Sequence, residues 1–283
     1  MPFQTSGAQR ASSTSRLRLF ILPLLALALA AGSAAFQPQA AAAASGVKVV
    51  IVVGPVEGQT ARYISNARSY AATARALGAS VTEIYSPNAT WSRVRAAAQG
   101  ANIFIYLGHG NGYPSPYGAF RATTRDGLGL NSSAGHGNYN LKYYGESYVR
   151  AYIKFDKNAV VLLNHLCYAA GNSEPGRALP TKSVASTRVD YFAGGFLRAG
   201  ARAVFANGLD SLTSIIRQLL TTSHTVAQIF TTDPTFSGRA DFRFASKRTS
   251  GFTAWLDPYA ASRYYHSVVG RLTMTASAVR AGS

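Results

Sequence analysis

Between residues 45 and 230, short apolar runs typical of strands alternate with segments whose apolar residues have helical spacing. Five short apolar runs rich in β-branched residues predict strands, at residues 47–53, 81–85, 102–107, 160–163 and 203–206. Helical spacing of apolar residues predicts helices between and after them, at residues 61–77, 90–99, 187–199 and 212–230. Strands that alternate with helices form βαβ units, so the pattern predicts an α/β domain with a mostly parallel central sheet.

Two regions interrupt or follow this alternation. Residues 111–148 are rich in Gly, Tyr, Pro, Ser and Asn, which predicts a long irregular insertion of the kind that usually carries function within a compact domain. Residues 231–283 are rich in Arg, Tyr and Ser with alternating patches. We therefore expect a domain over residues 45–230 and a C-terminal extension over residues 231–283 that packs on it, with a strand pair.

The amino terminus has the layout of a secretory signal peptide. Three arginines, at positions 10, 16 and 18, precede an apolar run over residues 19–31 and small residues up to position 44. The apolar stretch reaches 18 residues if it is extended to Phe36, so an uncleaved membrane anchor is the alternative. The alanine-rich segment favours cleavage, which predicts a leader over residues 1–44 and a secreted or cell-envelope protein without a membrane span.

The chain is strongly basic. It has 28 Lys and Arg against 11 Asp and Glu, a formal charge of +17, and loss of the three leader arginines would leave +14. Such an excess favours anionic partners, for example an anionic cell-wall surface. The basic residues are scattered arginines without a basic block or a nucleic-acid motif, so no nucleic-acid partner is expected.

Reactive side chains follow two of the expected strands. Gly108, His109 and Gly110 come directly after the strand at 102–107, and the strand at 160–163 leads to His165 and Cys167. The carboxyl ends of parallel strands share one sheet edge, so these groups are expected to meet there. A histidine can carry a proton and a thiolate can act as a nucleophile when its surroundings are positive. Cys167 is the sole cysteine, which excludes an internal disulfide and a thiolate-built metal cluster.

The ordered pair of segments resembles the caspase-like cysteine peptidases, which include caspases, metacaspases, legumains and gingipains. The matching segments are 103–110 (Ile-Phe-Ile-Tyr-Leu-Gly-His-Gly) and 159–167 (Ala-Val-Val-Leu-Leu-Asn-His-Leu-Cys), with His109 and Cys167 58 positions apart. The resemblance covers residues 46–230 and is that of an exported member of bacterial type. The caspase motif Gln-Ala-Cys-Arg-Gly is replaced by residues 165–169 (His-Leu-Cys-Tyr-Ala), which is closer to the looser legumain and gingipain pattern.

The resemblance implies a three-layer α/β sandwich and a Cys-His dyad that acts without a cofactor. Cys167 would be the nucleophile, His109 the proton-transferring partner, and the backbone N–H groups of Gly110 and Cys167 the oxyanion hole. Substrate pockets in this fold are built from loops after the strands, so three loop acids are candidates for recognising a basic side chain: Glu57, Glu174 and Asp210. Each of them is otherwise read as a solvated loop acid.

Three further residues have weaker alternatives. His165 could line the substrate site or join His109 and Cys167 around a metal ion, although a structural role is favoured. Asp126 and Asn131 have the oxygen side chains of a weak calcium candidate, but the segment lacks the acids of a calcium loop.

These observations predict an exported cysteine peptidase or related thiol hydrolase that acts on peptide bonds. The alternative is a catalytically inactive caspase-like binding module of the cell envelope, which would use the basic surface and the Tyr-rich insertion, because a fold does not fix a function.

Overall fold

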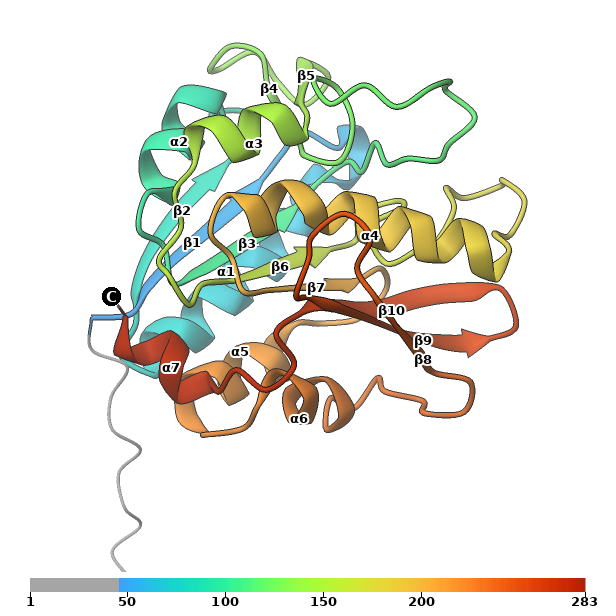
Figure 1. Ribbon diagram of the computed structural model, residues 1–283. Helices are drawn as coiled ribbons and strands as arrows, with labels where there is room; N and C mark the ends of the chain where they lie inside the picture. The colour runs from blue at the N-terminus through green and yellow to red at the C-terminus, as the bar shows by residue number, and fades with distance from the viewer. Residues whose placement is uncertain (1–45, 283) are drawn as a thin grey trace, which may run out of the picture. The chain divides into compact units, whose positions relative to one another are not determined.

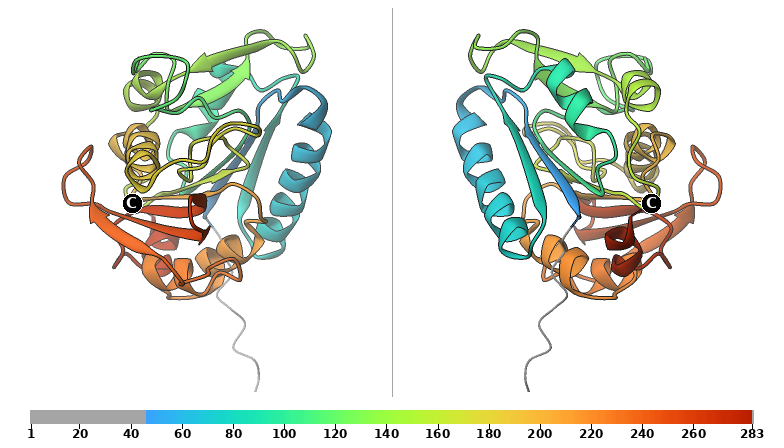
Figure 2. Two further views of the ribbon diagram at one scale, coloured as in Figure 1. Left: turned by 90° about the vertical axis from the view of Figure 1, so that its right-hand side faces the viewer. Right: turned by 90° about the vertical axis from the view of Figure 1, so that its left-hand side faces the viewer.

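A central sheet of eight strands with helices on both faces forms the core of the chain (Figures 1 and 2). The computed structural model describes residues 46–282. The strand order is β2-β1-β3-β6-β7-β10-β9-β8. The expected α/β class with a mostly parallel sheet between two helical layers is therefore confirmed, whereas the leader expected over residues 1–44 lies outside the described residues.

The five strands expected from the apolar runs form the parallel part of the sheet. They are β1 (Lys48–Val53), β2 (Ser80–Tyr85), β3 (Ile103–Leu107), β6 (Val160–Asn164) and β7 (Ala203–Asn207). Strands β3, β6 and β7 are buried along their whole length, because helices cover both faces of the sheet. Burial on both faces explains why these strands have continuous apolar sequences and no alternation.

The helices divide between the two faces, and each face has its own apolar core. One core packs α1 (Thr60–Ala76), α5 (Thr213–Thr221), α6 (Val226–Thr231) and α7 (Ala276–Ala281) against the sheet. The other contains α2 (Trp91–Ala98), α3 (Glu146–Tyr152) and α4 (Lys182–Arg198). Helix α4 begins five residues before the expected start, because the Thr181 side chain caps it by accepting a hydrogen bond from the Val184 N–H.

The C-terminal region completes the central sheet. Strands β8 (Phe242–Ala245), β9 (Thr253–Ala260) and β10 (Arg263–Gly270) are antiparallel, and β10 pairs with β7. The described residues before and after position 230 belong to one compact unit. The pairing covers the edge of β7, a strand that is buried on both faces.

The expected irregular insertion contains regular structure of its own. Strands β4 (Leu128–Asn131) and β5 (Leu141–Tyr144) form an antiparallel pair, and α3 begins inside the insertion. Leu128 and Leu130 are buried in the same core as α2 and α3. No helix in the described part of the chain is long and apolar enough to cross a membrane.

Candidate active site

The loops that follow β3 and β6 lie directly against each other. The two strands are neighbours in parallel register, with Leu107 opposite Asn164. Beyond their ends, a Cβ atom added to Gly110 would lie 1.9 Å from the Cys167 carbonyl oxygen, and one added to Gly112 would lie 2.3 Å from the Cβ of Tyr168. Only glycine allows these backbones to approach so closely, so the structure brings together the two segments that the sequence singled out.

Two backbone donors at this contact are free. Across residues 46–282, neither the Gly110 N–H nor the Cys167 N–H donates a hydrogen bond to another protein group. Unpaired N–H groups beside a nucleophile are suited to stabilise a developing oxyanion. The oxyanion hole expected at these two groups stays a prediction.

His109 is bonded to the carboxylate of Glu57, one of the three candidate acids for recognising a basic side chain. Its Nε2 lies 3.0 and 3.2 Å from the two carboxylate oxygens of Glu57. Glu57 begins a single 3-10 turn (Glu57–Gln59), separated from β1 by three residues, and has a φ of 43°. A carboxylate accepts hydrogen bonds, so Nε2 carries the proton and Nδ1 is left as the acceptor. Glu57 therefore orients His109, whereas no hydrogen bond within the described residues joins His109 to Cys167.

Cys167 lines a cavity of 380 Å³ between the loops after β6 and β7. Burial raises the pKa of its thiol to about 11, and the negative charge of Glu174 contributes to the rise. The surroundings of Cys167 therefore favour the thiol over the thiolate. A thiol with this pKa is protonated at neutral pH, so its use as a nucleophile requires a base.

His165 forms part of the same cavity wall, but its ring is fully engaged. It stacks on Tyr63 with ring centroids 5.1 Å apart. Its Nδ1 lies 3.3 Å from the Gly208 carbonyl oxygen and its Nε2 lies 3.0 Å from Nδ2 of Asn66. The carbonyl accepts, so Nδ1 carries the proton and Nε2 accepts from the Asn66 amide. Burial lowers the pKa of His165, and these contacts support the structural role.

The remaining loop acids lie in different places. Glu174 lines the Cys167 cavity, where its carboxylate accepts a hydrogen bond of 2.6 Å from the Tyr117 hydroxyl and lies 3.9 Å from Nε of Arg177. Asp210 is exposed and lines two neighbouring cavities without reaching that of Cys167. Of the three acids, Glu174 alone faces the thiol.

Asn164 and Tyr117 support the loops around the Cys167 cavity, and the sequence analysis does not single out either of them. Asn164 is buried at the end of β6, where it accepts from the Tyr70 hydroxyl at 2.8 Å and donates to the carbonyl oxygens of Asn207 and Asp210. A polar residue that ends an apolar strand was a usable signal for Asn164. Tyr117 had no such signal, because it is one of many tyrosines in the insertion.

The weak calcium candidates have separate protein partners. Asp126 is buried and accepts from the Tyr113 N–H, and burial raises its carboxyl pKa. The Asn131 side-chain oxygen accepts from the Ala89 N–H. Among residues 46–282, no group of three His, Cys, Asp or Glu side chains has the arrangement of a metal site.

Comparisons with known proteins give one structural likeness. No family model matches the chain, and no curated protein matches it. Among solved structures, the crystal structure of the Arg-specific cysteine proteinase gingipain R is similar, with 12% identity and a TM-score of 0.36. The similarity covers 83% of this chain and 62% of that one, so this chain spans less than two thirds of the length of gingipain R.

Proposed function

We propose that this protein is a cysteine peptidase or a related thiol hydrolase that cleaves peptide bonds at Cys167. The observation that carries the proposal is the contact between the Gly110 and Cys167 backbones, where a thiol and two free N–H donors lie beside the loop of a carboxylate-bound histidine. Thiol, oxyanion donors and oriented base are the parts that acyl transfer needs.

In the proposed reaction, Nδ1 of His109 takes the proton of the Cys167 thiol as sulfur forms a bond to the substrate carbonyl carbon. The carbonyl oxygen becomes an oxyanion that accepts from the N–H groups of Gly110 and Cys167. His109 then gives the proton to the leaving amine as the C–N bond breaks, which leaves the acyl group on sulfur as a thioester. Water, deprotonated by His109, attacks the thioester carbonyl, the C–S bond breaks to release the acid, and His109 returns the proton to the sulfur. The Glu57 carboxylate stabilises the imidazolium at each step, which matters because the raised pKa of the thiol makes proton removal costly.

Exposed apolar side chains around this edge support a polypeptide substrate. The described residues expose seven large apolar side chains, and six of them surround the edge: Tyr117, Tyr139, Leu141, Leu179, Leu209 and Tyr259. Leu179 and Leu209 line the Cys167 cavity, and Tyr259 lines the cavity beside Asp210. Apolar side chains gathered around a site indicate contact with an extended partner.

Glu174 supports a preference for a basic side chain in the cavity. Its carboxylate lines the same cavity as Cys167 and already has a guanidinium, that of Arg177, 3.9 Å away. A substrate Arg or Lys in the cavity would form an ion pair with the same carboxylate. The side chain of the residue whose carbonyl Cys167 attacks is therefore proposed to be basic.

A non-catalytic binding module is the second candidate. It is favoured by the raised pKa of Cys167 and by the absence, within residues 46–282, of a hydrogen bond between His109 and the thiol. Such a module would use the same apolar edge without bond cleavage.

The test is a peptide-library cleavage assay that compares the full chain with its Cys167→Ala variant. We expect cleavage by the native chain alone, with Arg and Lys enriched at the acyl side of the cut, and loss of that enrichment in Glu174→Gln. Asp210→Asn is the matched control, because this acid lies outside the Cys167 cavity. Absence of Cys167-dependent cleavage for every side-chain class would reject the peptidase in favour of the binding module.

A further inference from the structure

A buried arginine of α4 joins the two loops that form the site. The Arg188 side chain donates to the Pro114 carbonyl oxygen at 2.8 Å and to the Asn172 carbonyl oxygen at 2.9 Å. The same guanidinium donates to the Ser173 hydroxyl at 3.0 Å and lies 4.7 Å from the ring centroid of Tyr168. Pro114 belongs to the loop after His109, and the other three follow Cys167 within six residues.

We propose that Arg188 is a positioning residue that holds the His109 loop against the Cys167 loop, an inference that builds on the proposed function. Arg188 touches neither the thiol nor the imidazole. It acts through the loop backbones, whose contact at Gly110 and Gly112 places the two free N–H donors beside the thiol.

Within residues 46–282, Arg188 is buried without an ion pair, and its hydrogen-bond partners are neutral. Only 7% of its surface is exposed, and its hydrogen bonds go to neutral oxygens. Burial lowers its pKa, which shows that the buried site disfavours the cation, while the charge of Glu174 partly opposes this shift without a bond to the guanidinium. A buried charge without a carboxylate is unfavourable unless several oriented acceptors satisfy it. Here those acceptors are supplied by both loops, so Arg188 retains its set of hydrogen bonds only while the loops stay together.

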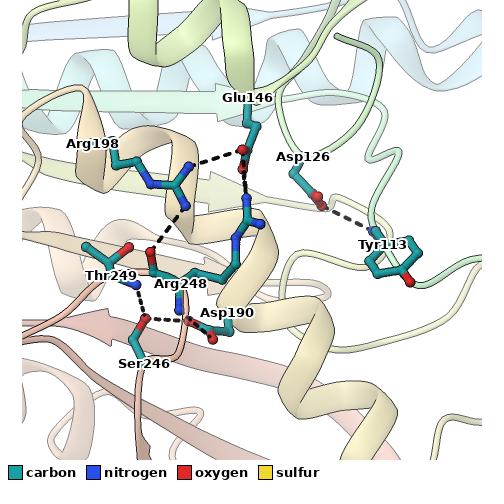
Figure 3. Close-up of polar contacts among 8 residues, drawn as sticks. All are labelled: Tyr113, Asp126, Glu146, Asp190, Arg198, Ser246, Arg248 and Thr249. Carbon is teal, nitrogen blue, oxygen red and sulfur yellow. Dashed lines mark hydrogen bonds and ion pairs between the residues drawn. The ribbon is translucent and has the colours of Figure 1, made fainter. Parts of the chain in front are cut away.

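Another arginine on the same helix shows the ordinary arrangement. Arg198 bonds to the buried carboxylate of Glu146 at 3.1 Å, and Arg248 reaches the same carboxylate at 2.6 Å (Figure 3). That cluster fixes the segment after β8 to α3 and α4, away from the Cys167 cavity. Arg198 therefore balances a buried acid, whereas Arg188 contacts neutral oxygens of the two loops.

Hydrogen bonds from Arg125 hold the His109 loop in the conformation that Arg188 contacts. Arg125 is buried and donates to the side chains of Asn111 and Ser115 and to the Tyr117 carbonyl oxygen. The Tyr117 hydroxyl in turn reaches Glu174 in the Cys167 loop. The loop is thus tied internally by Arg125 and externally by Arg188.

The experiment compares Arg188→Gln and Arg188→Lys with Arg280→Gln as the matched control. Arg280 likewise donates to neutral oxygens, the backbone carbonyl oxygens of Leu219 and Thr222, and burial also lowers its pKa, but it lies on α7. Hydrogen exchange over residues 110–118 and 166–174, kcat and KM for peptide cleavage, and Tm are measured for the full chain. Lysine keeps the charge but lacks the planar fork that spans both loops, so we expect it to give little rescue.

We expect Arg188→Gln to speed hydrogen exchange in both loops together. It should also lower kcat by about 10-fold or more while KM changes less than about 3-fold, because displaced oxyanion donors affect mainly the transition state. Arg280→Gln should lower Tm without either change. Unchanged exchange in the two loops, or equal changes in the control, would overturn the proposal, and if Arg188→Gln does not fold, Arg188→Lys is judged by the same criteria. Should the native chain cleave no peptide, the proposed function fails separately, and the exchange measurement still decides whether Arg188 joins the loops.

Discussion

Two histidines at the same sheet edge have opposite environments. His109 and His165 each lie within two residues of the end of a buried parallel strand, and these strands are neighbours. His109 is bonded through Nε2 to a carboxylate, and within the described residues its Nδ1 has no hydrogen-bond partner. Both ring nitrogens of His165 are occupied, and its ring is stacked on Tyr63. Both histidines follow a strand, so position does not distinguish them. The free ring nitrogen of His109 makes it the residue suited to carry a proton.

The largest expected difference between the two histidines is in activity. His109→Ala should lower kcat by about 100-fold or more, the usual loss when a general acid–base group is removed. His165→Asn should keep kcat within about 5-fold, because asparagine tolerates the φ of 60° at this position. Initial rates on the best library peptide give both values. A larger loss in His165→Asn than in His109→Ala would reverse the assignment of the two residues.

A smaller effect tests whether the carboxylate is what distinguishes His109. Glu57→Gln keeps an acceptor for Nε2 but removes the charge that stabilises the imidazolium, so kcat should fall by about 10-fold with KM nearly unchanged. Glu83→Gln is the control, because Glu83 is paired with Arg75 on the β2 side of the sheet. Equal rates in the native chain and in Glu57→Gln would remove Glu57 from the mechanism.

The smallest effect concerns stability and His165. Burial lowers its pKa, so the folded protein keeps the ring neutral while the unfolded chain binds a proton below about pH 6.5. The unfolded state then holds more protons, and stability is present above pH 6.5 and falls as the pH drops towards the folded-state pKa. The slope is at most about 1.4 kcal/mol per pH unit for one proton.

Urea unfolding at pH 7 and pH 5 measures this dependence. The free energy of unfolding should fall less between the two values in His165→Asn than in the native chain. The exposed His136→Asn serves as the control and should behave like the native chain. The same loss of stability in His165→Asn as in the native chain would show that the His165 contacts do not depend on its neutral form.

The sequence predicted the part of the fold that depends on local periodicity. The five parallel strands lie where the apolar runs placed them, and the segments of His109 and Cys167 meet because parallel neighbours end at the same edge. The sequence also identified Glu174 as a candidate, and the structure places it in the Cys167 cavity. It offered Glu57 only as a candidate for substrate recognition or as a solvated loop acid, since spacing alone does not show which side chain an acid will contact.

Contacts between distant segments were decided by tertiary structure alone. The C-terminal strands joined the central sheet because β7 offered an unpaired edge, a property of the assembled sheet that local periodicity does not contain. Arg188 became part of the site because α4 packs where loops separated by more than fifty residues pass side by side. Periodicity records which face of an element is buried, so the sequence by itself determined the elements and the shared edge of the sheet. The partner of a buried charge depends on which loops the packing brings within hydrogen-bond reach, and the fold decided that.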